Sequence, residues 1–140
     1  MDGMLTRAAA AKMISNFAMN LLGMKPDTTR ACTFSDTVDQ DGELQKYMTL
    51  SCQLGLMGLN NSDRMSAKTF EPGGFVNKAQ FATIISRMLY GDTYNSNDVC
   101  WYCKHVDVLK SNKIINITTD LLDPFKRGRA MLMLKRIHEK

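Results

Sequence analysis

The chain has 140 residues, of which 44% are hydrophobic and 23% are charged, and its formal net charge is +4. This length and balance predict a single globular domain with a real hydrophobic core, and they exclude a disordered chain. No apolar run approaches the roughly 18 residues that a membrane-spanning helix needs, so we expect no membrane insertion.

In chain order, the apolar spacing predicts five helices separated by long loops, with no convincing strand. The helices are expected at about residues 6–22, 42–54, 77–90, 99–112 and 123–138. Thr6 and Asn77 are suitable N-caps, Gly23 and Gly91 are suitable stops, and Pro124 suits a first helical turn. The expected fold class is therefore all-α.

Three of these helices share one pattern: a basic residue, then a small residue, then apolar residues at helical spacing. The basic residues are Arg7, Lys78 and Arg127. The helices that precede the second and third of them also keep a common apolar phase. Two matched helix pairs in one order predict an assembly of helical repeats.

The middle repeat carries the most complete set of motifs. They read, in chain order, Phe34-Ser35-Asp36, Leu54-Gly55-Leu56-Met57-Gly58, Phe70-Glu71-Pro72 and Val76-Asn77-Lys78-Ala79-Gln80-Phe81. This order resembles the S-layer homology module, whose pattern is Phe-x-Asp-Val, a helix closing on Gly-Ile, Phe-x-Pro, and Thr-Arg-Ala-Glu-Phe. The resemblance implies a five-helix repeat assembly of helix–loop–helix modules.

On this resemblance, one domain would span residues 1–140. It would hold the second half of a first module (1–30), a complete second module (31–91) and a degenerate third module (92–140). Three such modules usually form a mostly helical unit that anchors surface proteins non-covalently to an anionic cell-wall polysaccharide. The implied function is thus non-catalytic attachment at the bacterial cell surface, with other surface-protein segments as further partners.

The resemblance also implies the binding residues. In the family, the Arg of each Thr-Arg-Ala-Glu motif lines a groove between modules and meets acidic groups of the polymer. Carried over by position, these residues are Arg7, Lys78 and Arg127, with Thr6 opening the first motif and Asp36 holding a loop near them. No repeat keeps the acidic fourth residue, which favours an alternative: an interaction or assembly module that has lost glycan binding.

The four cysteines allow several interpretations. Since an even number in a surface protein suggests disulfides, we favour a bond from Cys32 to Cys52, with Cys100 to Cys103 as a weaker local candidate. A zinc site that includes His105 is the alternative, although Cys32 and Cys52 lack paired ligand spacing. Four reduced thiols in a cytosolic protein would be the other outcome. We expect no metal and no cofactor.

Several functional classes lack their sequence signals. There is no Ser-His-Asp set, no pair of catalytic carboxylates, no Walker loop and no GxGxxG, so we expect no enzyme. The basic residues of 126–140 fit a solvated helix face better than a nucleic-acid interface, for which no recognition helix is evident. The start is no convincing signal peptide, because Lys12 ends the apolar run 8–11. An exported protein would then be longer than this chain.

Overall fold

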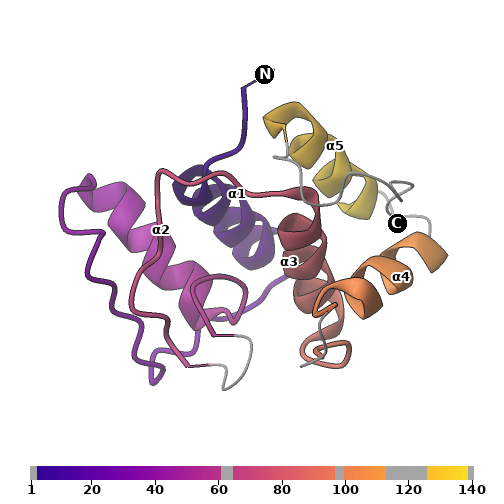
Figure 1. Ribbon diagram of the computed structural model, residues 1–140, viewed down its shortest axis with the longest axis horizontal. Helices are drawn as coiled ribbons and strands as arrows, with labels where there is room; N and C mark the ends of the chain where they lie inside the picture. The colour runs from indigo at the N-terminus through magenta and orange to yellow at the C-terminus, as the bar shows by residue number, and fades with distance from the viewer. Residues whose placement is uncertain (1–2, 61–64, 97–99, 113–125, 139–140) are drawn as a thin grey trace. The chain divides into compact units, whose positions relative to one another are not determined.

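The structure is a computed structural model that describes residues 3–60, 65–96, 100–112 and 126–138, without the side chains of 127–129, 136 and 138. These residues form five α-helices and no β-strand, so the expected all-α class is confirmed (Figure 1). The helices are α1 (Arg7–Asn20), α2 (Gly42–Gln53), α3 (Lys78–Tyr90), α4 (Cys103–Ser111) and α5 (Arg127–His138).

The chain divides into two compact units. One consists of Thr6–Gly74 and is called the α1–α2 unit below. The other combines Met1–Leu5 with Phe75–Lys140 and is called the α3–α5 unit.

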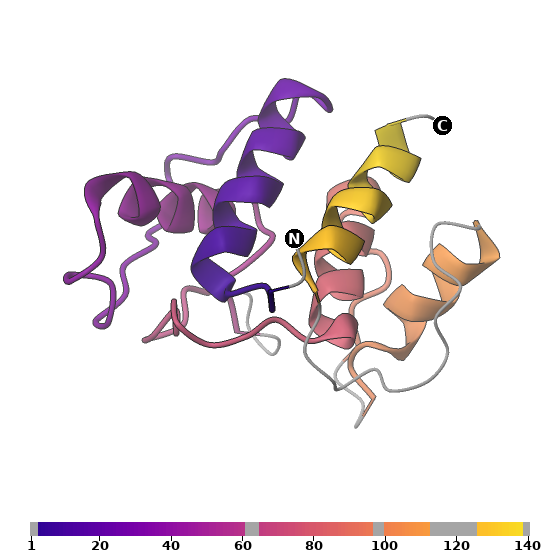
Figure 2. The ribbon, with the colours of Figure 1, turned by 90° about the horizontal axis from the view of Figure 1, so that it is seen from above.

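In the α1–α2 unit, the two helices pack against each other (Figure 2). Alanines on the inner face of α1 let the backbones approach closely, and the Ser15 hydroxyl donates a hydrogen bond to the Tyr47 carbonyl at 3.3 Å. The loops that follow each helix fold over this pair and bury their aromatic residues. The buried residues of this unit include Ile14, Phe17, Met48, Leu56, Met57 and Phe70.

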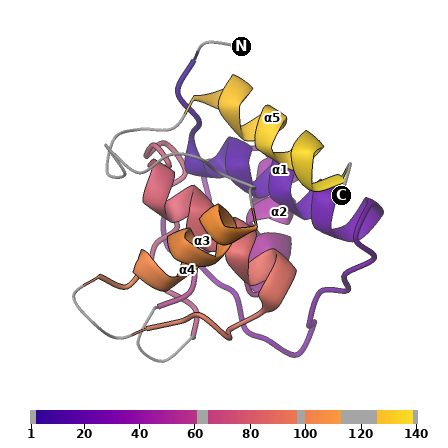
Figure 3. The ribbon, with the colours of Figure 1, turned by 90° about the vertical axis from the view of Figure 1, so that its right-hand side faces the viewer.

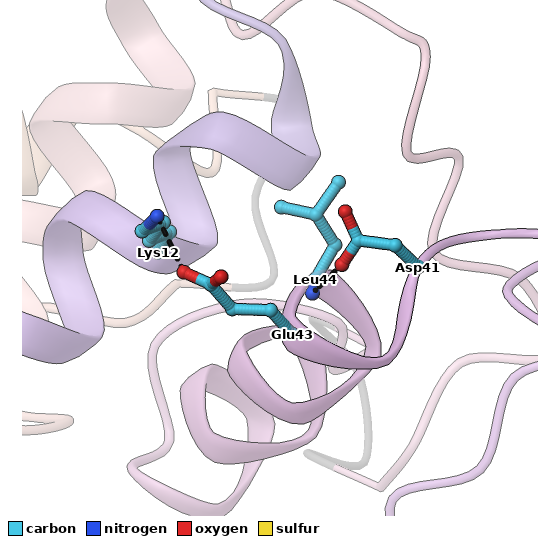
Figure 4. Close-up of polar contacts among 4 residues, drawn as sticks. All are labelled: Lys12, Asp41, Glu43 and Leu44. Atoms are coloured by element: carbon cyan, nitrogen blue, oxygen red, sulfur yellow. Dashed lines mark hydrogen bonds and ion pairs between the residues drawn. The ribbon is translucent and has the colours of Figure 1, made fainter.

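Side-chain caps begin both helices, as the sequence predicts for α1. The Thr6 hydroxyl accepts a hydrogen bond from Ala9 N at 3.1 Å, and the Asp41 carboxylate accepts one from Leu44 N at 2.9 Å (Figure 4). Such caps satisfy amides that have no partner within the helix. Figure 4 also shows the exposed ion pair between Lys12 of α1 and Glu43 of α2.

In the α3–α5 unit, α3 packs against α4 (Figure 3). A capping box begins α3: Gln80 N donates to the Asn77 side chain at 2.7 Å, and Asn77 N donates to the Gln80 side chain at 2.9 Å. The buried residues of this unit include Leu5, Val76, Phe81, Ile84, Ile85, Leu109, Ala130 and Met133.

The N-terminal segment of the α3–α5 unit lies between the starts of α3 and α5. Val76 N donates to the Leu5 carbonyl at 2.8 Å, and Met4 forms an isolated antiparallel bridge with Lys126. Leu5 and Val76 are both fully buried. The first described residues of the chain therefore belong to the core that is built by residues after Gly74.

The fourth helix begins later than the sequence predicts, at Cys103 instead of about residue 99. The preceding residues form a turn in which Cys103 N donates to the Cys100 carbonyl at 3.3 Å. The expected first residue, Val99, and the expected start of the last helix at Asp123 and Pro124 lie outside the described residues.

Candidate functional site

Asp36 fastens two loops of the α1–α2 unit together. Its carboxylate accepts hydrogen bonds from the backbone N–H groups of Phe70 and Glu71, both at 2.8 Å. Two charge-assisted bonds from consecutive amides hold a carboxylate strongly and fix its orientation. The expectation that Asp36 holds a loop therefore has a geometric basis here, and the loop is 70–74.

These bonds also change the acidity of Asp36. Partial burial acts to raise its pKa, but the bonds from Phe70 N and Glu71 N, together with its own backbone N–H, outweigh that effect. The positive charge of Arg7 acts in the same direction as the bonds. The pKa of Asp36 thus lies below its ordinary value, because the charged form is the one that accepts these hydrogen bonds.

Arg7, the first residue of α1, is held against Phe70. Its Nε donates to the Phe70 carbonyl at 2.7 Å, and its guanidinium lies 5.2 Å from the centroid of the Phe70 ring. The backbone joins the same loop, since Arg7 N donates to the Gly74 carbonyl at 2.8 Å and Ala8 N donates to the Pro72 carbonyl at 3.1 Å. The start of α1 and loop 70–74 are therefore one rigid piece of structure.

Arg7 is partly buried yet keeps its charge. Burial lowers the pKa of its guanidinium, while the negative charges of Glu71 and Asp36 oppose that effect. An arginine nevertheless stays protonated in proteins. Among the described residues, no group accepts a hydrogen bond from either Nη of Arg7, so the outer edge of the guanidinium has two donor groups without an acceptor.

Two aromatic motif residues explain the shape of this region. The rings of Phe34 and Phe70 meet edge to face, with centroids 5.1 Å apart. Gly58 lies directly over them in a left-handed conformation, with φ of 74°, and a Cβ there would come within 2.7 Å of the Phe34 ring. We name Arg7, Phe34, Asp36, Phe70 and Glu71 the Phe70 cluster.

Glu71 is a residue of this cluster that sequence reasoning missed. It is the only described non-glycine residue with a positive φ, 59°, and its carbonyl accepts a hydrogen bond from Gly74 N at 3.0 Å. A left-handed conformation is costly for a side chain of this kind, and it persists where surrounding contacts fix it. The only sequence signal is the Pro-Gly-Gly that follows, which marks a tight turn.

The predicted binding residues fall into two groups. Thr6, Arg7 and Asp36 are brought together in the α1–α2 unit, where the Thr6 hydroxyl serves as the cap of α1. Lys78 and Arg127 are the first residues of α3 and α5 in the other unit, on either side of the Met4–Leu5 segment. Lys78 is partly exposed, and the side chain of Arg127 is not among those that the structure describes.

All four cysteines are in disulfide bonds. Cys32 is joined to Cys52, the pair that the sequence favours, which ties the loop after α1 to the buried face of α2. Cys100 is joined to Cys103 at the start of α4. Since both pairs are closed, these thiols are not zinc ligands in this structure. The described residues contain no group of three or more His, Cys, Asp or Glu side chains placed to hold a metal ion.

A polar network inside the α3–α5 unit was not predicted. His105 is fully buried, with Nδ1 2.7 Å from the Ser86 hydroxyl and Nε2 3.0 Å from Asn95 Oδ1. Arg87 Nε donates to the same oxygen at 3.0 Å. Because Asn95 Oδ1 can only accept, Nε2 of His105 carries a proton. The sequence signal would have been Ser86 on the apolar face of the third helix.

The comparisons with known proteins add no family assignment. No family model matches the chain, and no curated protein matches it. None of the described helices is both long and apolar enough to cross a membrane.

Proposed function

We propose that this chain is a non-catalytic attachment module of the bacterial cell surface, built from repeats like those of the S-layer homology family, that binds an anionic cell-wall polysaccharide. The observation that carries the proposal is the state of Arg7. Its guanidinium is fixed through Nε and its face, while both Nη groups lack an acceptor among the described residues. A fixed guanidinium edge can donate two parallel hydrogen bonds to a carboxylate.

The fixed conformation of the Arg7 side chain should also strengthen its binding of an anion. A free arginine loses rotamer freedom when it binds, and that loss weakens binding. In Arg7 the contacts with Phe70 already restrict the side chain before any ligand binds, so less rotamer freedom remains to be lost.

The proposed repeat architecture has its own support in the helix packing. The packed pairs are α1 with α2 and α3 with α4. Each pair joins the second helix of one proposed module to the first helix of the next. The Phe70 cluster further gives a physical role to the Phe-x-Asp and Phe-x-Pro motifs of the middle module.

The cysteine chemistry supports a location outside the cytoplasm. Disulfides persist in oxidising compartments and are rare where thiol reductants are abundant. A chain with all of its cysteines paired fits the former setting.

A retention assay on purified anionic wall polysaccharide tests the proposal. We expect the wild type to be retained, and the variant with Arg7, Lys78 and Arg127 all changed to alanine to be lost. The matched control is Lys25→Ala, which removes an exposed positive charge of the α1–α2 unit away from the Phe70 cluster. A second control is the polymer with its carboxylates reduced to alcohols.

Circular dichroism of each variant separates loss of binding from loss of fold, because Arg7 also contacts Phe70. Equal retention of the wild type and a folded triple variant would rule out these residues as the binding site. Retention on the carboxyl-reduced polymer would rule out the charge mechanism.

A second candidate function is protein–protein assembly without glycan binding. The observation in its favour is that no repeat keeps the acidic fourth residue of the family motif. This function predicts a discrete oligomer or complex with another surface-protein segment in sedimentation experiments, together with no retention on the polymer.

A further inference from the structure

The two disulfides of this chain lie in different environments. Cys32 and Cys52 are buried, with 8% and 0% of their surfaces exposed, and they are 20 residues apart in the chain. Cys103 is exposed and Cys100 is partly exposed, and only three positions separate them. An external thiol can therefore approach the second pair in the folded protein, whereas the first pair is covered by the core.

The surroundings of the exposed pair favour a thiolate. Cys103 is the first residue of α4, a helix of nine residues without an acidic side chain in its first turn. The partial positive charge of a helix start stabilises negative charge on sulfur, and so does a neighbouring cation such as Lys104. The nearest acid on the same helix, Asp107, lies one turn further along and is exposed.

Two aromatic residues lie between the cysteines. The rings of Trp101 and Tyr102 meet edge to face, with centroids 5.1 Å apart, and both residues are partly exposed. They provide partly exposed apolar surface between the two cysteines of the chain, against which the flanking residues of a thiol-bearing peptide can pack.

We propose that the Cys100–Cys103 disulfide is an exchangeable redox pair that accepts two electrons from external thiols, while the Cys32–Cys52 disulfide is structural. The inference does not depend on glycan binding. It joins three observations: exposure of the two cysteine residues, their place at the start of α4, and the aromatic pair between them.

The exchange is a pair of substitutions at sulfur. An external thiolate attacks the more exposed Cys103 Sγ, a mixed disulfide forms, and Cys100 leaves as a thiolate that takes a proton from water. A second external thiolate then attacks the sulfur of the first reagent, which releases the Cys103 thiolate. In total, the disulfide and two thiols become a dithiol and one new disulfide.

Reduction of the full-length oxidised chain by reduced glutathione tests the proposal. Samples are taken over time, quenched with an alkylating reagent and mapped by mass spectrometry. We expect label at Cys100 and Cys103 to appear at least about tenfold faster than label at Cys32 and Cys52, because the buried pair must wait for local opening. Equal rates, or earlier labelling of the buried pair, would overturn the proposal.

An equilibrium measurement in glutathione buffers provides the second test. Structural disulfides resist reduction by glutathione, whereas exchangeable ones equilibrate with it. We expect the Cys100–Cys103 pair to pass from oxidised to reduced as the ratio of reduced to oxidised glutathione increases. A pair that stays fully oxidised at the most reducing ratio would contradict the inference.

The single tryptophan provides an independent optical signal. Trp101 lies between the two cysteines, so its emission should change as the neighbouring disulfide opens. The variant with both Cys100 and Cys103 changed to alanine should lose this response while it keeps its helical circular dichroism. An identical response in that variant would show that the signal, and the assignment, belong to Cys32 and Cys52.

Discussion

At the scale of single residues, Asp36 has the most consequential position in the α1–α2 unit. Its carboxylate accepts hydrogen bonds from the backbone amides of Phe70 and Glu71, which lie 34 and 35 positions further along the chain. The same contacts orient the carbonyl of Phe70, which in turn accepts the bond from Arg7 Nε. A carboxylate that looks like a surface acid in the sequence thus positions the proposed binding arginine.

The change Asp36→Asn should destabilise the protein by about 1–2 kcal/mol, because one backbone N–H would face an amide NH2 in place of a carboxylate oxygen. Urea denaturation followed by circular dichroism measures this loss. Asp39→Asn is the matched control, since Asp39 is an exposed acid of the same loop without a hydrogen bond to loop 70–74. Equal effects of the two changes would contradict the role given to Asp36.

The lowered pKa of Asp36 also predicts how stability depends on pH. The folded state binds the proton of this group more weakly than the unfolded state does, so the contribution is fully present above the ordinary pKa of about 4. It is lost as the pH falls below that value and through the lower folded pKa. The difference in unfolding free energy between the wild type and Asp36→Asn should therefore shrink toward acid pH, and a constant difference would refute this.

The sequence predicted the residues of the Phe70 cluster better than their contacts. Asp36 and Arg7 were expected to lie near each other, and they do act on each other through charge. The bond of Arg7 to a backbone carbonyl, and the left-handed conformation of Glu71, depend on how loops pack. Neither composition nor periodicity encodes such loop geometry.

At the scale of elements, helix ends with side-chain caps were predicted well and the start of α4 was not. Thr6 and Asn77 cap their helices as expected, since a cap is a local interaction over three residues. Tyr102 makes no side-chain capping bond, and the turn closed by Cys100 and Cys103 replaces the first expected turn of α4. The disulfide and the turn override the apolar spacing there.

Two glycines near the ends of α2, Gly42 and Gly58, differ in how much space there is for an added methyl group. Gly58→Ala should destabilise the protein by more than about 2 kcal/mol, because the new methyl group would meet the Phe34 ring at 2.7 Å in a left-handed conformation. Gly42→Ala, at the start of α2, is the matched control: nothing lies within 4 Å of a Cβ there. Thermal unfolding of both variants measures the two effects. A melting temperature of Gly58→Ala equal to that of the wild type would refute the packing of this turn.

At the scale of the whole molecule, the buried disulfide is the main covalent constraint on the α1–α2 unit. A variant with Cys32 and Cys52 both changed to alanine should lose about 3 kcal/mol of stability, the typical effect of closing a loop of this length. Denaturant unfolding under oxidising conditions measures it. Amide hydrogen exchange should show faster exchange in α1 and α2 than in α3 for this variant.

The matching alanine variant of Cys100 and Cys103 should have a much smaller effect, because its loop spans only three positions. A larger loss from the exposed pair than from the buried pair would contradict the division into one structural and one exchangeable disulfide.

The order of the two units along the chain has a consequence for synthesis. Residues Thr6–Gly74 are contiguous, so the whole α1–α2 unit is synthesised before the last third of the chain. Met4 and Leu5 precede this unit in the chain, whereas their partners Lys126 and Val76 follow it. Leu5, which is fully buried in the finished protein, therefore gains its partner Val76 only after the α1–α2 unit has been made. The core of the α3–α5 unit thus includes a segment that is made before the α1–α2 unit.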